Sequence, residues 1–186
     1  MIDGAERVAS EAAAAAGVSI TPVATLDDID ALRAVMGEIW GPSVVPPRNV
    51  LRAMSFADTG LLLARDDGRV VGFSIGLAGF TGGLHFHSHQ VGVVTDHRST
   101  GVGYAIKLAQ RVECLRHGID EMRWTFDPML RSNAVFNLLR LGARVIEFIP
   151  DAYGRRDDAF NTGDVTDRLK VSWNLTTVIG AESSSD

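Results

Sequence analysis

Apolar residues recur at helical spacing in two long stretches of the chain. Residues three and four apart share one face of a helix. The two series are Leu26, Ile29, Leu32, Val35, Met36, Ile39 and Val102, Ala105, Ile106, Ala109, Val112, Leu115. Thr25 and two acidic residues precede the first series and Gly41-Pro42 follows it, whereas Gly118 follows the second. These boundary signals predict helices over about 26–40 and 101–117.

Shorter apolar segments, separated by turn residues, predict strands over 18–24, 60–65, 70–80, 84–95, 121–126, 143–149 and 169–175. Asp66-Asp67-Gly68-Arg69 is typical of a hairpin turn, because glycine adopts positive φ readily. Further helices are expected over 1–17, 46–57 and 132–141, and a loop over 150–166. Three strands joined by hairpins and followed by βα units predict an α/β chain of the α+β type, with a mixed, mostly antiparallel sheet. We expect a helical extension over 1–17, one domain over 18–176 and a flexible tail over 177–186.

Composition narrows the classes of partner. The net charge of −5 argues against a nucleic-acid partner, and one cysteine, Cys114, excludes an internal disulfide. Cys114 lies in an apolar helical stretch, so we expect a small buried hydrophobe. No apolar run approaches the roughly 20 residues of a membrane span. The acidic residues near the start are unlike a secretion signal, so we expect a cytoplasmic protein without a membrane partner.

A glycine-bearing loop joins the strand at 84–95 to the helix that follows it. The junction carries Arg98-Ser99-Thr100-Gly101-Val102-Gly103. Free N–H groups in the first turn of a helix attract anions, and glycine lets a phosphate approach the backbone. Ile106 occupies the third small position of a dinucleotide fingerprint, and the loop lacks the Gly-Lys-Ser/Thr end of a P-loop. The residues therefore favour another kind of phosphate site, although such glycines are often only turn residues.

This junction resembles motif A of the GCN5-related N-acetyltransferases, the GNAT superfamily, in which Arg or Gln is followed by x-x-Gly-x-Gly/Ala. His87-Ser88-His89, Trp124-Thr125-Phe126-Asp127-Pro128 and Thr166-Asp167-Arg168-Leu169 are similar to a little-characterised branch of it. The resemblance spans about 18–175 and implies a GNAT fold whose sheet is splayed at an acyl-CoA site. It implies coenzyme A contacts at Val91, Val93, Arg98, Thr100, Gly101, Val102, Gly103, Tyr104, Asn133 and Asn137. It also implies acetyl-CoA or another acyl-CoA as co-substrate, no metal, a small-molecule amine as acceptor and a homodimer.

Three histidines, His85, His87 and His89, alternate along the predicted strand. The period of two places them on one face, about 6.7 Å apart, and we expect Val91 and Val93 to continue that face. The histidines fit a polar strand face, a general base, or two ligands of a zinc site. Several GNAT members carry an acidic base on this strand, eleven residues before the first Arg or Gln of the motif. That position is His87 here, so we predict His87, and next His89, as the catalytic base.

The resemblance fails at two positions. Many GNAT enzymes place a thiolate-protonating Tyr where this chain has Leu138, and an Asn where it has Arg131. Asn133 and Asn137, four residues apart, lie on one helical face nearby. The general acid is therefore unassigned at this point. The expected function is transfer of an acetyl or succinyl group from coenzyme A to a primary amine, such as that of an amino acid. The alternatives are a non-catalytic acyl-CoA-binding module and a zinc hydrolase.

Overall fold

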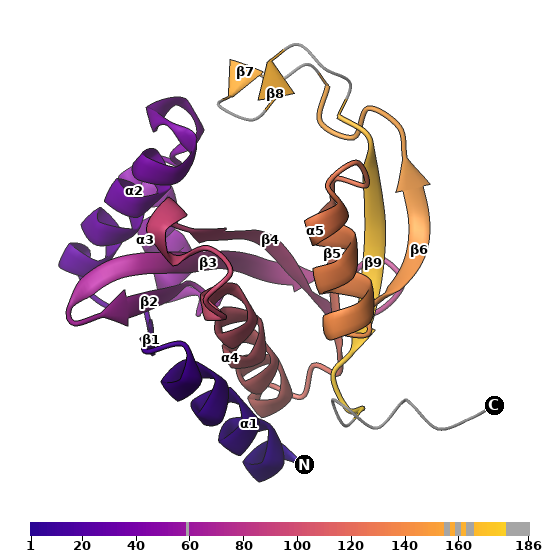
Figure 1. Cartoon of the computed structure of the whole chain (residues 1–186), viewed down its shortest axis with the longest axis horizontal. Coiled ribbons are helices and arrows are strands. Elements are labelled where there is room, and N and C mark those ends of the chain that lie inside the picture. Colours follow the sequence, from indigo (N-terminus) through magenta and orange to yellow (C-terminus); the bar gives the residue numbers. More distant parts are fainter. Residues whose placement is uncertain (59, 155–156, 159–160, 163–165, 178–186) are drawn as a thin grey trace.

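A 7-stranded sheet organises the computed structural model, which describes residues 1–58, 60–154, 157–158, 161–162 and 166–177. The strand order is β1-β2-β3-β4-β5-β9-β6 (Figure 1). Its members are β1 (Ser19–Pro22), β2 (Leu62–Asp66), β3 (Arg69–Gly79), β4 (His85–Val93), β5 (Glu121–Phe126), β6 (Arg144–Ile149) and β9 (Arg168–Asn174). Only β4 and β5 pair in parallel. The predicted mixed, mostly antiparallel sheet is confirmed.

The helices lie close to their predicted positions. They are α1 (Ile2–Ala15), α2 (Leu26–Trp40), α3 (Arg48–Phe56), α4 (Val102–Arg116) and the short α5 (Arg131–Ala134), which continues into the π-helix η3 (Val135–Arg140). Short 3-10 turns are η1 (Pro42–Val44) and η2 (Thr95–His97). Thr25 begins α2 as a capping box: its Oγ1 accepts from the Asp28 N–H, and the Asp28 carboxylate accepts from the Thr25 N–H. Two unsatisfied N–H groups of the first turn are thereby paired.

The two faces of β3 and β4 pack against different helices. Phe73 of β3 packs edge-on against Trp40 of α2, with ring centroids 5.1 Å apart. A Cβ built on Gly72, the preceding residue, would lie about 3 Å from Val102 and Ile106 of α4. Alternate residues therefore face α2 on one side of the sheet and α4 on the other. On the α4 side α1 packs along α4, and its Ala5 is buried.

Three further sequence expectations concern the late part of the chain. The expected loop over 150–166 contains two paired two-residue strands, β7 (Asp157–Asp158) and β8 (Asn161–Thr162), which are too short to leave a periodic pattern. The expected tail lies outside the described residues from 178 onward. β6 is an edge strand with exposed Val145, Ile146 and Phe148, and the expected homodimer stays a prediction. None of the described helices has the length and apolarity that a bilayer crossing requires.

Candidate active site

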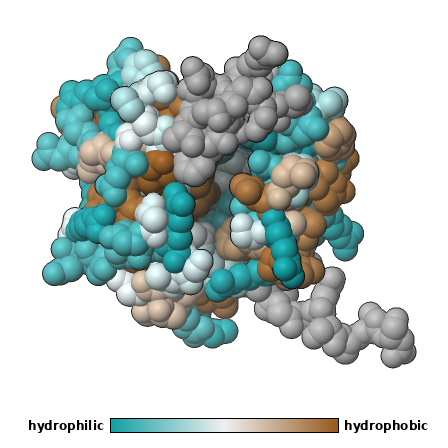
Figure 2. All heavy atoms as spheres, turned by 45° about the horizontal axis from the view of Figure 1, so that its top comes forward, coloured by the Kyte–Doolittle hydropathy of each residue, from teal (hydrophilic) through white to brown (hydrophobic). Residues whose placement is uncertain are grey.

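The two central strands separate shortly after they meet. Phe86 and His87 of β4 pair with Met122 and Arg123 of β5. Beyond that point β4 continues along β3 to Val93, while β5 pairs with β9. The described chain gives residues 88–93 of β4 no strand partner on the β5 side. Figure 1 shows the strands diverging, and Figure 2 shows the surface hollowed between the two halves of the molecule. We call this divergence the fork.

The first turn of α4 is open to an anion. Gly101, its N-cap, has φ 101° and offers no side-chain cap. The nearby side chains turn into the loop instead: Thr100 Oγ1 donates to the carbonyl of His97 at 2.7 Å, and Arg98 Nε to that of Val93 at 3.4 Å. The backbone N–H groups of Val102, Gly103 and Tyr104 therefore stand at an uncapped, electropositive helix end. This arrangement fits a phosphate group.

Space is left beside Gly103. A Cβ built there would meet only Val93 Cγ2, at 3.8 Å, and its φ is ordinary for a helix. Val102 itself is buried in the core, so only its backbone can serve the site. Glycine therefore keeps the surface of this first turn low where an anion would approach the backbone.

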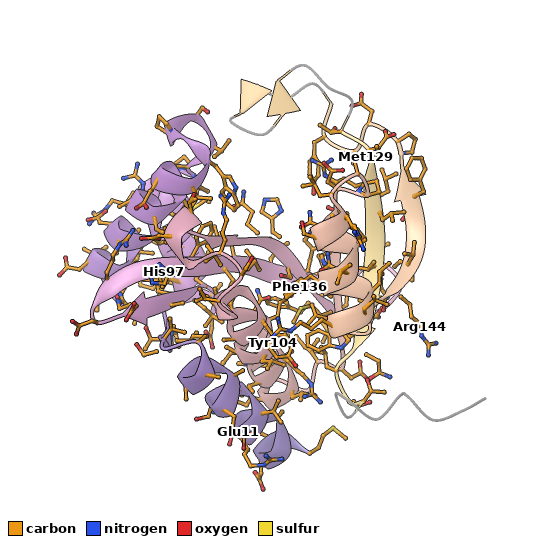
Figure 3. The ribbon with its side chains drawn as sticks, viewed as in Figure 1. Glu11, His97, Tyr104, Met129, Phe136 and Arg144 are labelled. Atoms are coloured by element: carbon orange, nitrogen blue, oxygen red, sulfur yellow. The ribbon has the colours of Figure 1, made fainter. Side chains whose placement is uncertain are left out.

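Basic and aromatic residues of α5 and η3 lie near the same helix end. The guanidinium of Arg140 lies 4.1 Å above the Tyr104 ring, which joins η3 to the first turn of α4. Figure 3 shows Tyr104 and Phe136 between α4 and η3. A hollow of about 420 Å³ adjoins them, lined by Arg131, Ser132, Val135, Phe136 and Arg140. The two arginines give this hollow a positive rim.

The three histidines have different surroundings. His85 is buried, and its Nδ1 lies within hydrogen-bonding distance, 2.9 Å, of the carbonyl of Gly83. This contact stabilises the turn before β4. His87 is half-buried and its ring stacks on that of exposed His89, with centroids 6.2 Å apart. Burial, then the neighbouring His89 and His85, lower the pKa of His87. Its imidazole is therefore neutral at pH 7 and able to accept a proton.

A β-bulge overturns one expectation about this strand. Gly76 pairs with Ser88, but its neighbour Ile75 pairs with Gln90, so His89 is the extra residue. The alternation shifts by one position at the bulge. Val93 consequently pairs with Gly72, and Val91 pairs with Ser74. Gly72 faces α4, so both valines lie on the α4 face of the sheet. The expectation that Val91 and Val93 continue the histidine face is wrong, because period-two alternation assumes an unbroken ladder.

The two asparagines predicted to contact coenzyme A, Asn133 and Asn137, differ in burial. Asn137 is buried, and its Oδ1 accepts a hydrogen bond from Trp124 Nε1 at 3.0 Å. It orients the indole that walls the β5 side of the fork. Asn133 is half-buried near the beginning of α5, and Leu138 packs into the apolar core. The coenzyme A roles of Asn133 and Asn137 stay predictions.

The structure brings to the fork one residue to which the sequence assigned no role. Lys107 of α4 is only 3% exposed. Its Nζ donates to Ser88 Oγ at 2.8 Å and lies 3.8 Å from both Met122 Sδ and the centroid of the Trp124 ring. Ser88 Oγ in turn donates to Gln110 Oε1 at 2.9 Å. Burial lowers the pKa of Lys107 to about 7.

Metal ligands do not gather in the part of the chain that the structure describes. There, no group of three or more His, Cys, Asp or Glu side chains is arranged to hold an ion. Cys114, the candidate small hydrophobe, is buried as expected, and burial raises the pKa of its thiol to about 12. Neither observation favours the zinc-hydrolase interpretation.

Comparisons with known proteins reveal relatives only at the level of structure. No family model matches the chain, and no curated protein matches it in sequence. Solved structures do match. One is the ribosomal-protein-S18-alanine N-acetyltransferase of Escherichia coli, at 12% identity and TM-score 0.63, with 90% of this chain and 99% of that chain covered.

Two further matches were solved with coenzyme A groups bound. yncA of Salmonella typhimurium, with its cofactor acetyl-CoA, is 18% identical with TM-score 0.66, covering 91% of this chain and 99% of that chain. Arabidopsis thaliana Naa50, in complex with the bisubstrate analogue CoA-Ac-MVNAL, is 17% identical with TM-score 0.62, covering 84% and 97%. At these identities the likeness shows the fold. The chain has the GNAT acetyltransferase fold, as the resemblance implied.

Proposed function

We propose that this protein is an acyl-CoA-dependent N-acyltransferase that moves an acetyl or succinyl group to the primary amine of a small molecule, an amino acid or a related metabolite. The observation that carries the proposal is the fork between β4 and β5 beside the uncapped first turn of α4, within a GNAT fold. This combination offers backbone hydrogen-bonding groups to an extended arm and positive dipole ends to a phosphate. Both are features of coenzyme A.

The residues around the fork suit the parts of an acyl-CoA. The N–H groups of Val102, Gly103 and Tyr104 suit the pyrophosphate, and the unpaired edge of β4 near Val91 suits the amide-bearing pantetheine arm. A backbone N–H at that edge would polarise the thioester carbonyl, as the GNAT resemblance implies. Arg131 and Arg140, on the adjoining hollow, add positive charge for phosphate.

His87 supplies the base. A primary amine is mostly protonated at neutral pH and cannot attack a thioester until it loses a proton. Because burial and its neighbouring histidines lower the pKa of His87, its imidazole is neutral at pH 7 and can take that proton, directly or through water. His89, stacked on it and exposed, is the second candidate.

The decisive experiment measures free thiol released from acetyl-, succinyl- and other acyl-CoAs across a panel of amino acids and related amines. Transfer predicts thiol release that depends on the amine, with an N-acylated product of the expected mass. Leu138, where many GNAT enzymes have Tyr, favours the alternative of a binding module. Tight acyl-CoA binding by calorimetry without thiol release on any amine would establish that alternative.

A further inference from the structure

We propose that Lys107 is the general acid of the transfer, giving its proton to the sulfur of the coenzyme A thiolate as it leaves. The inference rests on the proposed acyl transfer. It assigns the acid that Leu138 leaves open, because Leu138 has no proton to donate. The carrying observation is the place of the Lys107 amine in the fork.

Lys107 Nζ lies where the two central strands part. The last paired residues are His87 of β4 and Arg123 of β5. Ser88 and Trp124 are the next residue on each strand, and Nζ contacts both, at 2.8 Å and 3.8 Å. The amine thus bridges the two strands at the base of the fork, on the α4 side. A thioester held along the unpaired edge of β4 would have its sulfur beside this amine.

The charge on Lys107 has little compensation. Among the described residues no carboxylate pairs with Nζ; its polar partner is the hydroxyl of Ser88. The titratable groups that face it are Cys114 on its own helix, whose pKa of about 12 keeps the thiol neutral, and His87, on the opposite face of β4. Burial therefore brings the pKa of Lys107 to about 7. An acid whose pKa is near the working pH donates and regains its proton most effectively.

The network around Lys107 also has an unsatisfied donor. Ser88 Oγ accepts from Lys107 and donates to Gln110 Oε1. Gln110 Nε2 is buried, with no hydrogen-bond partner in the part of the chain that the structure describes. Buried polar groups without partners are rare and costly, so a polar cluster of this kind is expected where it serves a ligand or a reaction.

The proposed step balances in atoms and charge. The amine nitrogen bonds to the thioester carbonyl carbon, and the C–S bond breaks with its electron pair going to sulfur. The ammonium of Lys107 gives one proton to that sulfur and becomes a neutral amine. The attacking amine loses its proton to His87 or to water, and solvent reprotonates Lys107. A thiol pKa of about 8.5, that of cysteine, lies close enough to that of Lys107 for this transfer.

The first test compares leaving groups in Lys107→Met, with acetyl-CoA and its selenoester analogue as donors. A selenol is much more acidic than a thiol and leaves without an acid. We expect Lys107→Met to lower kcat with acetyl-CoA by about 10²-fold, the lower end for general acid catalysis, and far less with the selenoester. Lys170→Met is the matched control, since Lys107 and Lys170 are the only lysines, and should keep the wild-type ratio of the two rates. Equal losses with both donors would overturn the proposal.

Two checks exclude a merely structural effect. Lys107→Met should melt at or above the wild-type temperature, because it removes an unpaired buried charge. Lys107→Arg keeps a positive charge, but its guanidinium holds its proton at neutral pH. It should therefore fail to restore kcat. Full activity in Lys107→Arg would assign Lys107 an electrostatic role instead of proton transfer.

The second test needs no turnover. Labelling lysine at the ε carbon with ¹³C gives two NMR signals, and Lys170→Met assigns them. If the coenzyme A sulfur lies against Nζ, the amine and the thiol titrate as a coupled pair that favours ammonium with thiolate, so the titration curve of Lys107 should shift to higher pH in coenzyme A but not in desulfo-coenzyme A. The same titration with both ligands would overturn the contact. Absence of acyl transfer to every amine would instead reject the proposed function, and this titration would still decide the place of Lys107.

Discussion

Neighbouring residues of β4 point to opposite faces of the sheet, and the two faces carry groups of opposite function: a proton acceptor on one and a proton donor on the other. His87 and His89 lie on the half-open face with stacked rings, whereas Ser88, between them in sequence, lies on the closed face and binds buried Lys107. One face holds a proton acceptor, because the pKa of His87 is lowered. The other holds a proton donor with a pKa of about 7. The comparison suggests that one strand places a base and an acid on opposite sides of the proposed thioester site.

The largest effect is expected on the histidine face. His87→Ala should lower kcat by roughly 10²–10⁴-fold, the range of general base catalysis, with acyl-CoA affinity almost unchanged. The pKa of His87 is lowered, so the wild-type rate should fall below about pH 6.5, where the imidazole is protonated. It should also fall above about pH 7, where Lys107 loses the proton that it is proposed to donate. The variant should lack the acidic limb and keep the basic one. Steady-state rates across pH measure both.

His89→Ala is the matched control, since His89 stacks on His87 but is exposed. A larger loss in His89→Ala than in His87→Ala would move the base two residues along the strand. Near-full activity of both single variants and of the double variant at pH 7 would make the histidine face structural.

The second effect contrasts the packing of the two faces. Gly76 and Leu77 are neighbours on β3, opposite Ser88 and His87 respectively. A Cβ on Gly76 would lie 2.0 Å from Phe86 Cζ, so Gly76→Ala should lower the free energy of unfolding by about 1–3 kcal/mol through overpacking. Leu77 is 39% exposed, so Leu77→Ala should cost less. Urea denaturation of both variants measures the difference. Equal losses of unfolding free energy would contradict the tighter packing of the face of β3 and β4 that lies against α4.

The third effect concerns the proposed phosphate site, at the first turn of α4 after β4 ends. Gly103→Val should weaken coenzyme A binding by about tenfold or more, because the side chain enters the space next to the free N–H groups. Gly37→Val in α2 is the control, since a Cβ there also meets one valine methyl at 3.8 Å. It should fold and bind coenzyme A as wild type does. Unchanged affinity of Gly103→Val by calorimetry would place the phosphate site elsewhere.

Local patterns predicted the fold well. The α2 cap at Thr25, the hairpin at Asp66–Arg69 and the end of α4 just before Gly118 are all set by neighbouring residues. Such signals need no knowledge of the rest of the chain. The bulge at His89 left no such signal, because it depends on the pairing of β4 with β3. The face of Val91 and Val93 was therefore predicted wrongly.

Lys107 was missed for a related reason. The apolar series that predicted α4 leaves Lys107, Gln110 and Arg111 on another side of the helix, which usually faces water. In the structure all three are buried, because α4 packs against both the sheet and α1, and Arg111 Nε donates to the Leu175 carbonyl near the described C-terminal end. Two signals were available, neither of which gave Lys107 a role: lysine is rare in this arginine-rich chain, and the run Lys107-Leu108-Ala109-Gln110-Arg111 is part of the family resemblance. Only the tertiary packing shows that the side of α4 with Lys107 and Gln110 lies next to the fork.

The smallest predicted effect tests whether the two faces sense each other. The positive charges of Lys170 and Lys107 are among the causes that lower the pKa of His87, with Lys170 the larger and both smaller than burial. Removing either charge favours protonation of the imidazole, so the pKa of His87 should rise towards its ordinary value in Lys170→Met and, less, in Lys107→Met. The acidic limb of the rate profile should move to higher pH in the same order. Imidazole proton NMR of both variants, with His87→Ala to assign the signal, measures the shift directly. An unchanged His87 titration in Lys107→Met would mean that the acid and the base on the two faces of β4 titrate independently.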